Sequence, residues 1–303
     1  MTSEPAADAP ALEREPAPPP PGTVEAWAWA YVTTTSLAGK LDPAATPSVW
    51  EPSPPARRLS APGRPPELTR LGKSPRTPRD LVDVRRRAQL FHSFLHHELQ
   101  AAELMCWALC AFADAPPPFR RGLVVLFWDE VRHLRAYAGH LATLGFRPGD
   151  FPVRDWFWER VPRCRSPAEL TATLGIGFEG GNLDHGERFA VRLGAAGDAV
   201  GAELCARVAH EEEAHVRFAW RWFWRFVARS ERGEAALPGG EGQGSSTVAA
   251  PADDEAAFRT WREHLPAPLS PLLMRGVPLN REARLRAGLP AGFVERLARW
   301  PDV

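Results

Sequence analysis

The feature that most constrains the fold is a pattern of glutamate and histidine that occurs twice at nearly the same spacing. It consists of Glu98, Glu130 and His133 in the first copy and of Glu179, Glu212 and His215 in the second. The first glutamate precedes the second by 32 residues in one copy and by 33 in the other. Each copy therefore has room for two helices and a turn, with a glutamate on one helix and Glu-x-x-His on the next. Together the copies predict a bundle of four helices.

The apolar periodicity and the helix-end signals support this arrangement. Long helices are expected over about residues 84–112, 118–144, 166–193 and 198–232. Ser166 and Pro167 provide an N-cap and a proline at the first helical position, and Gly145 is a typical C-terminal stop. Because the connections between paired helices are short, neighbouring helices are expected to run antiparallel. The fold class is therefore all-α.

The rest of the chain divides by composition. Residues 1–22 are rich in Pro, Ala and Glu and predict a disordered tail. Residues 23–83 contain a short aromatic helix, to about residue 41, and a Pro-rich segment that wraps over the surface. The bundle occupies 84–233, a flexible Gly- and Ser-rich linker 234–253, and short helices 254–303, one of them capped by Asn280.

The charge balance and the cysteines exclude several classes of protein. The 37 basic and 37 acidic residues cancel, so binding to nucleic acid is not expected. The N-terminus lacks the features of a secretory signal, and no apolar run is long enough to cross a membrane. The four cysteines contain no Cys-x-x-Cys pair and are expected to be free thiols. We expect a cytoplasmic protein.

The four glutamates lie on apolar helix faces. At helical spacing, Phe94 and Ala102 flank Glu98, and Phe127 lies beside Glu130. The other two glutamates have similar neighbours. Burying an ionised carboxylate without a partner is very costly, so four such acids require cations or protons.

Metal ions meet this requirement with the residues available. Residues i and i+3 of a helix share a face, so each Glu-x-x-His can present both side chains to the same place. A di-metal carboxylate bundle uses one glutamate from each of two helices and Glu-x-x-His from the other two. The predicted ligands of two metal ions are Glu98, Glu130, His133, Glu179, Glu212 and His215. Carboxylates with one imidazole per metal favour iron, with manganese or a mixed Mn/Fe pair as alternatives.

Acidic residues next to the two motifs are candidates for supporting the histidines. Imidazoles that bind metal usually donate their other N–H to a carboxylate. Asp129 directly precedes the first motif and Glu211 the second. We expect Asp129 to support His215 and Glu211 to support His133 across the bundle.

Further residues are alternatives or weaker candidates. Glu103 is a rival to Glu98, but its face is more polar and its distance from Glu130 does not match that of the second copy. Asp184 and His185 lie one and a half turns after the third-helix glutamate and could support the metal site or contact a substrate.

Two glycines follow Glu179 inside the third predicted helix. Gly180 and Gly181 would each destabilise a helix by about 1 kcal/mol relative to alanine. Close approach of another segment, or a π-bulge near the metal site, would explain them.

Several longer motifs resemble one known family. They are HHELQAAE at 96–103, FPVRDWFW at 151–158, EGGNLDH at 179–185 and HVRF at 215–218. Over about residues 23–232 the chain is similar to the family catalogued as domain of unknown function 455. The resemblance implies a ferritin-like four-helix bundle, with the extended N-terminal segment and short C-terminal helices added to it, and a di-iron centre on the six ligands named above. It implies no established reaction. More distantly, the chain is similar to rubrerythrins and to tRNA-modifying hydroxylases, although it lacks the four-cysteine iron site of rubrerythrins.

These observations favour a metal-dependent oxidoreductase. We expect a di-iron oxygenase, hydroxylase or oxidase that uses O₂ or peroxide, a small-molecule substrate and an external reductant. A pocket lined by the Trp-rich connector and by Trp220, Trp222 and Trp224 would support this function. The alternatives are a non-catalytic iron-binding or peroxide-scavenging protein and a bundle whose acids are structural. A homodimer is left open.

Overall fold

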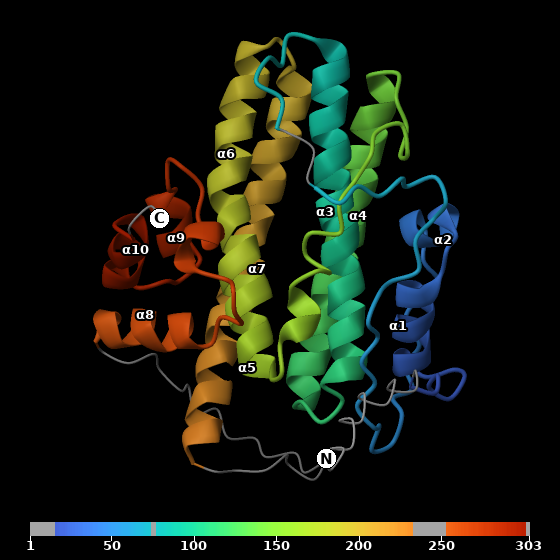
Figure 1. Cartoon of the computed structure of the whole chain (residues 1–303), viewed down its shortest axis with the longest axis vertical. Helices are drawn as coiled ribbons and strands as arrows, with labels where there is room; N and C mark the ends of the chain where they lie inside the picture. The colour runs from blue at the N-terminus through green and yellow to red at the C-terminus, as the bar shows by residue number, and fades with distance from the viewer. Residues whose placement is uncertain (1–15, 74–76, 233–252, 301–303) are drawn as a thin grey trace, which may run out of the picture.

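The described part of the chain is mostly helical. The computed structural model describes residues 16–73, 77–232 and 253–300, and within these ranges it contains helices and two isolated β-bridges but no named strand (Figure 1). The predicted all-α fold class is therefore confirmed.

Four long helical stretches lie side by side and form a bundle (Figure 1). They are α3 (Val84–Ala111), α4 (Pro117–Thr143), a discontinuous third stretch that ends in α6 (Gly180–Ala195), and α7 (Ala199–Glu231). The first, second and fourth match the predicted ranges to within one residue at each end. Short loops join α3 to α4 and α6 to α7, so each pair is antiparallel.

Local capping groups set the helix ends. The carboxylate of Asp83 accepts a hydrogen bond from the backbone N–H of Arg86 and begins α3. Ser166 and Asp198 cap the third stretch and α7 in the same way. Gly145, just after α4, has φ of 84°, the left-handed conformation that favours glycine at a helix C-terminus.

The third helical stretch is not a continuous α-helix. It begins with α5 (Pro167–Leu170), continues as a π-helix over Thr171–Glu179 and resumes α-geometry in α6. The glycines here also admit another segment. A Cβ on Gly180 would lie 3.1 Å from Nη1 of Arg284, and one on Gly177 would lie 2.5 Å from the sulfur of Met274. Gly180 and Gly181 thus follow directly after a π-helix, and Arg284 closely approaches the first of them, so both features expected for this pair are present.

The hydrophobic core forms two clusters along the bundle axis. On α7, Val208 belongs to one cluster and Val216 to the other. On α3, Leu99 belongs to the same cluster as Val208, and Ala102 to the same cluster as Val216. Glu212 lies between the two positions on α7, so a polar layer separates the two halves of the core.

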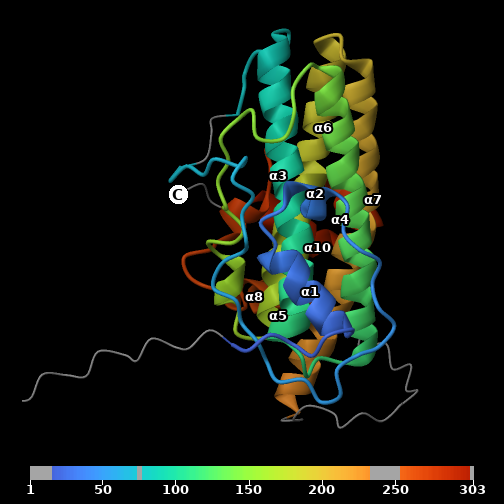
Figure 2. The ribbon, with the colours of Figure 1, turned by 90° about the vertical axis from the view of Figure 1, so that its right-hand side faces the viewer.

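The N-terminal segment packs on the face made by α3 and α4. The helix predicted over 23–41 is interrupted at residues 34–36, and the structure has α1 (Val24–Thr33) and α2 (Leu37–Leu41). Ser36 breaks the helix because its side chain accepts a hydrogen bond from Gly39 N and caps α2. Trp27 and Tyr31 contact the ring of Phe127 edge-on, each at 4.7 Å. The chain then runs over the surface without long helices, as predicted (Figure 2).

The C-terminal segment packs on the opposite side, against the third stretch and α7 (Figure 1). It contains α8 (Asp254–Glu263), a 3₁₀ turn (Pro271–Met274), α9 (Arg281–Arg286) and α10 (Ala291–Ala298). Asn280 caps α9, as predicted. Trp261 and Phe293 are fully buried, and the indole of Trp261 donates a hydrogen bond to the carbonyl of Ala172 in the π-helix at 3.0 Å.

Two predicted segments fall largely outside the described residues. Of the tail expected over 1–22, residues 16–22 are described, and Ala17 O accepts a hydrogen bond from Arg57 Nε at 2.9 Å. Of the linker expected over 234–253, only Asp253 is described, and it caps α8. The four cysteines are free thiols, as predicted, and all four are buried. Among the described helices, none has both the length and the apolar character that crossing a membrane requires.

Candidate metal centre

The six predicted ligand residues lie together in the polar layer inside the bundle. α3 carries Glu98, α4 carries Glu130 and His133, the π-helix ends at Glu179, and α7 carries Glu212 and His215. None of the six is more than 5% exposed. The helical spacing therefore brings together six side chains from four helical stretches.

Their oxygen and nitrogen atoms form two groups that share Glu130 and Glu212. The first group adds Glu98 and His133, and the second adds Glu179 and His215. Within each group, one such atom from every residue lies within 4.8 Å of the others. Each group could hold a metal ion, and the two sites would have two carboxylates in common.

Both imidazoles present Nδ1 to the carboxylates of this layer. Nδ1 of His133 lies 3.3 Å from an oxygen of Glu212 and 3.5 Å from one of Glu98. Nδ1 of His215 lies 2.9 Å from Glu212 and 3.0 Å from Glu130. Glu212 thus lies close to both histidines, and Glu130 also reaches both, since its carboxylate lies 4.0 Å from Nδ1 of His133.

Many buried polar atoms in this layer have no hydrogen-bond partner among the described residues. They are both carboxylate oxygens of Glu130 and of Glu212, Oε1 of Glu179, and Nδ1 of His133 and of His215. An unsatisfied buried group costs about 1–3 kcal/mol, and native proteins leave few of them. Metal ions would use the lone pairs of all these atoms at once, so the residues present fit a metal centre.

The pKa values of these groups show how strongly they compete for positive charge. Burial raises the pKa of Glu98 and of Glu179 well above the ordinary value, and neighbouring carboxylates raise it further. Burial lowers the pKa of His133, but Glu212 and Glu98 outweigh burial and raise it to about 11. Burial opposes the charge on Glu212, yet His215 and His133 hold its pKa below the ordinary value. Without metal, protons neutralise the layer, and metal binding would displace them.

The outer nitrogens of the two imidazoles face acidic residues. Nε2 of His133 lies 2.7 Å from Glu211, and Nε2 of His215 lies 3.4 Å from Asp129. Arg132 forms ion pairs with both Asp129 and Glu211 and so links the two histidine–carboxylate pairs at the surface. The structure therefore brings together both pairs expected from the sequence.

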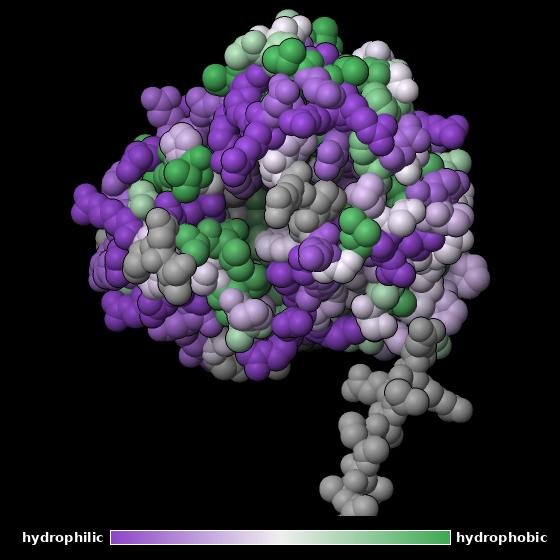
Figure 3. Space-filling model, turned by 45° about the horizontal axis from the view of Figure 1, so that its top comes forward, coloured by the Kyte–Doolittle hydropathy of each residue, from purple (hydrophilic) through white to green (hydrophobic). Residues whose placement is uncertain are grey.

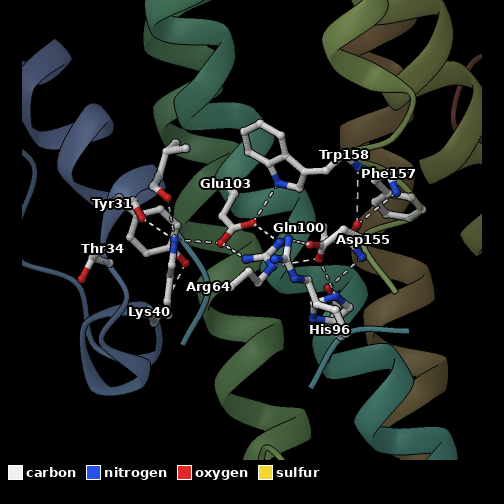
Figure 4. Close-up of polar contacts among 12 residues, drawn as sticks. Tyr31, Thr34, Lys40, Arg64, His96, Gln100, Glu103, Asp155, Phe157 and Trp158 are labelled. Atoms are coloured by element: carbon white, nitrogen blue, oxygen red, sulfur yellow. Dashed lines mark hydrogen bonds and ion pairs between the residues drawn. The ribbon is translucent and has the colours of Figure 1, made fainter. Parts of the chain in front are cut away.

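Glu103, the rival to Glu98, takes part in a separate charge network (Figure 4). Its buried carboxylate lies 2.8 Å from Nζ of Lys40, is bonded by Arg64 and accepts a hydrogen bond from the indole of Trp158 at 2.8 Å. Burial opposes its charge, but the two cations outweigh burial and lower its pKa. Its oxygens are thus already partnered, whereas Glu98 faces His133 of α4.

Asp184 and His185 have different surroundings. Asp184 is buried and pairs with Arg284 at 2.7 Å, and it accepts hydrogen bonds from the backbone N–H groups of Gly276 and Asn280, each at 2.7 Å. It therefore anchors the C-terminal segment. His185 instead lines a cavity beside the candidate metal centre.

That cavity has a volume of about 440 Å³ and reaches the centre at Glu98 and Glu212. Its apolar walls come from all four helical stretches and from the connector after α4, and include Phe94, Tyr137, Phe157, Phe178, Phe189 and Val208. The face shown in Figure 3 is hollowed near its centre, with hydrophobic residues inside the hollow. Phe157 belongs to the connector that was expected to line a pocket, whereas the other wall residues were not predicted. The available signal was helical spacing, since Phe94 lies four residues before a ligand on α3 and Tyr137 seven after one on α4.

The tryptophans expected around a pocket divide into two sets. Trp156 of the connector lines the cavity. Trp220, Trp222 and Trp224 are not among its described lining residues and instead belong to the buried core, where Trp220 contacts Phe293 of α10 at 5.1 Å. Trp220 thus packs toward the C-terminal helices, whereas Trp222 contacts Phe119 of α4 at 5.2 Å.

Comparisons with known proteins place the chain in a family without supplying an activity. Searches of curated proteins and of solved structures found no match. One family model matches residues 25–295, which extends the region of resemblance expected over 23–232 through most of the C-terminal segment. The chain therefore belongs to the family described as protein of unknown function, DUF455.

Proposed function

We propose that the protein is a di-iron oxidoreductase built on a ferritin-like bundle. Two iron ions would be held by Glu98, Glu130, His133, Glu179, Glu212 and His215. A small molecule in the adjoining cavity would be oxidised by O₂ or peroxide, with an external reductant supplying the remaining electrons.

The observation that supports this proposal most directly is the sharing of Glu130 and Glu212 by two ligand groups. Two adjacent sites with common carboxylates suit a pair of divalent ions, whose four positive charges would balance four glutamates. The oxygens of these two residues face imidazole nitrogens but make no hydrogen bond to a described residue, which agrees with this assignment. A purely structural acid cluster would instead be expected to pair with Lys or Arg, as Glu103 does.

The protein's own groups prepare the imidazoles for metal binding. When Nε2–H of His133 donates a hydrogen bond to Glu211, the neutral ring leaves the lone pair of Nδ1 free inside the layer. Asp129 is placed to do the same for His215, although its distance of 3.4 Å is longer. A bound iron pair would supply reversible redox change and open positions for an oxygen species.

The ligand chemistry favours iron or manganese over zinc. Structural zinc sites are usually tetrahedral and rich in cysteine or histidine. Here each group contains three carboxylates and one imidazole. Iron is the preferred assignment, and manganese or a mixed Mn/Fe pair would use the same residues.

The cavity favours catalysis over storage. Its volume of about 440 Å³ lies within the range of small-molecule sites, and its walls are mainly apolar and aromatic. Direct contact with Glu98 and Glu212 would place a bound molecule beside the metals. Iron storage or peroxide removal would not require an apolar chamber of this size.

The proposal can be tested by loading the protein with Fe(II) without oxygen and measuring iron by elemental analysis, followed by optical spectra on exposure to O₂. We expect two irons per chain and a transient visible absorption in the wild type. Glu130→Ala should lose both, because this residue belongs to both ligand groups. His215→Ala should lose at least one iron and the absorption.

Surface variants on α7 provide matched controls. Glu203 and His210 are exposed on the helix that carries Glu212 and His215, so Glu203→Ala and His210→Ala should keep both irons. Binding of less than one iron or manganese per folded wild-type chain would refute the metal proposal. Two irons with steady peroxide consumption, but no oxidation of any cavity-bound molecule, would favour the scavenging alternative.

A further inference from the structure

The cavity beside the candidate metal centre carries one positive charge that is not neutralised. Arg188 on α6 lines the cavity and forms no ion pair with any described carboxylate. Its Nη1 donates to the carbonyl of Val277 and its Nη2 contacts Nδ1 of His185, at 3.0 and 2.9 Å. Its Nε is buried and has no hydrogen-bond partner. This guanidinium is thus held in place by neutral groups.

The other charged groups nearby do not neutralise it. Asp184, one turn earlier on the same helix, is paired with Arg284, and Glu187, the residue directly before Arg188, accepts a hydrogen bond from Asn280. Arg192, one turn later, adds positive charge and donates to backbone carbonyls. Arg154, another cation of the cavity wall, is paired with Glu159 at 2.6 Å.

The second polar group beside this cation is an uncharged donor. Burial, followed by the charge of Arg188, lowers the pKa of His185 to about 4, so the ring is neutral at pH 7. Because its Nδ1 accepts from Arg188, the proton of the neutral ring lies on Nε2. Nε2 makes no hydrogen bond to a described residue. Arg188 and His185 together therefore offer a charge and an N–H to one acceptor.

The positions along the helices separate this pair from the metal centre. α6 rises about 1.5 Å per residue, so Arg188 lies about 9 Å beyond Asn182, which donates to Glu179 of the centre. On α3, the wall from Glu98 to Leu90 spans about 12 Å. The cavity is thus an elongated chamber with carboxylates at one end and an unpaired cation toward the other. The aromatic wall lies between them.

We propose that this chamber binds an organic oxyanion, a carboxylate or a phosphate monoester, with an apolar and preferably aromatic body. Arg188 and His185 hold the anionic head group, and the body extends along the aromatic wall on the order of 10 Å toward Glu98 and Glu212. The inference rests on the proposed function for the role of the inner end, where the body would be oxidised. A head group bound at the outer end keeps the negative charge away from the acidic layer.

Phenylbutyrate, its neutral amide and phenethyl phosphate are suitable probes. Their dissociation constants would be measured by calorimetry on the Fe(II)-loaded protein without oxygen and on the metal-free protein. We expect the wild type to bind at least one of the anions about tenfold or more tightly than the amide. The stronger of the two anions identifies the head group.

Arg188→Gln tests the residue directly. It should abolish the preference for the anion and leave the affinity for the amide within about twofold, since the aromatic wall is unchanged. Arg188→Lys should restore part of the preference. Arg207→Gln, an exposed arginine on α7, is the control and should bind like the wild type. Thermal unfolding of each variant would verify that it is folded.

The outcomes separate this inference from the metal proposal. Equal affinity of wild type and Arg188→Gln for the anions would overturn the assignment of the head-group site. So would the absence of saturable binding of both anions to either form of the protein. An Arg188-dependent preference in a protein that binds no iron would keep the oxyanion site and reject the di-iron centre. Two bound irons without an anion preference would keep the di-iron centre and reject the oxyanion site.

Discussion

The two glutamine variants Glu98→Gln and Glu212→Gln should affect the metal-free protein very differently, although both remove one carboxylate from the same layer. Burial raises the pKa of Glu98 well above its ordinary value, so the protonated form of this side chain is favoured when no metal is bound. An amide resembles a protonated carboxyl group in shape and charge. The free energy of unfolding of metal-free Glu98→Gln should therefore lie within about 1 kcal/mol of the wild-type value.

Glu212 has the opposite character. Two imidazoles hold its pKa below the ordinary value, so it is ionised and pairs with His133 and His215 at 3.3 and 2.9 Å. Removing one partner of a buried ion pair typically costs about 3–5 kcal/mol. Deprotonation of the histidines would relieve part of this cost, so metal-free Glu212→Gln should lose about 2–4 kcal/mol.

Metal addition then separates folding from binding. Ligand at a hundred times its dissociation constant stabilises a protein by about 2.7 kcal/mol, which raises the Tm of a chain of this size by about 4 °C. The wild type should show this rise with Fe(II), and both variants should show much less. Urea unfolding and calorimetry, with Glu203→Gln as control, measure these quantities. A loss above about 2 kcal/mol in metal-free Glu98→Gln, or an undiminished metal response in either variant, would refute the reasoning.

Three further predictions concern pH and the two buried charge networks. The pKa of His133 is raised from 6.5 to about 11 in the folded metal-free protein. The stability that its protonation contributes is therefore present below pH 6.5 and is lost as the pH rises toward 11. The Tm of the metal-free protein should fall between about pH 7 and 10, which calorimetry at several pH values tests. Glu103→Gln should cost about 3–5 kcal/mol in urea unfolding, because it leaves Lys40 partly unpaired, while iron per folded chain stays unchanged. Arg284→Met should leave Asp184 buried without its cation, and limited proteolysis should cut the C-terminal segment faster than in the wild type.

The parts of the structure that follow from local chemistry could be predicted from the sequence. Ser166 and Gly145 mark helix ends through hydrogen bonds to residues within one turn, and Pro167 marks a helix start through its fixed φ; the observed ends agree with them. The six candidate ligands could be selected because helical periodicity converts sequence spacing into a position on a face. The helix predicted over 23–41 was wrong in its continuity, since the hydroxyl of Ser36 caps a second helix.

Contacts between distant segments could not be predicted in this way. Lys40 reaches Glu103 and Arg284 reaches Asp184, and neither pair lies within one repeating pattern. In the sequence, nothing distinguishes Lys40 or Arg284 from an exposed cation, because their burial depends on contacts between distant segments. The role of Arg188 was missed for the same reason, because it and its neighbours face a cavity that exists only after the helices pack.

The π-helix over Thr171–Glu179 links two parts of the chain that are far apart in sequence. Such helices are uncommon and usually limited to a single turn, so nine residues need external support. That support comes from the C-terminal segment: Trp261 bonds to Ala172, and Met274 lies against Gly177. The amide hydrogens of 171–179 should therefore exchange with solvent together with those of the C-terminal helices, as one cooperative unit. The position of Glu179 would then be coupled energetically to the docking of a segment outside the bundle.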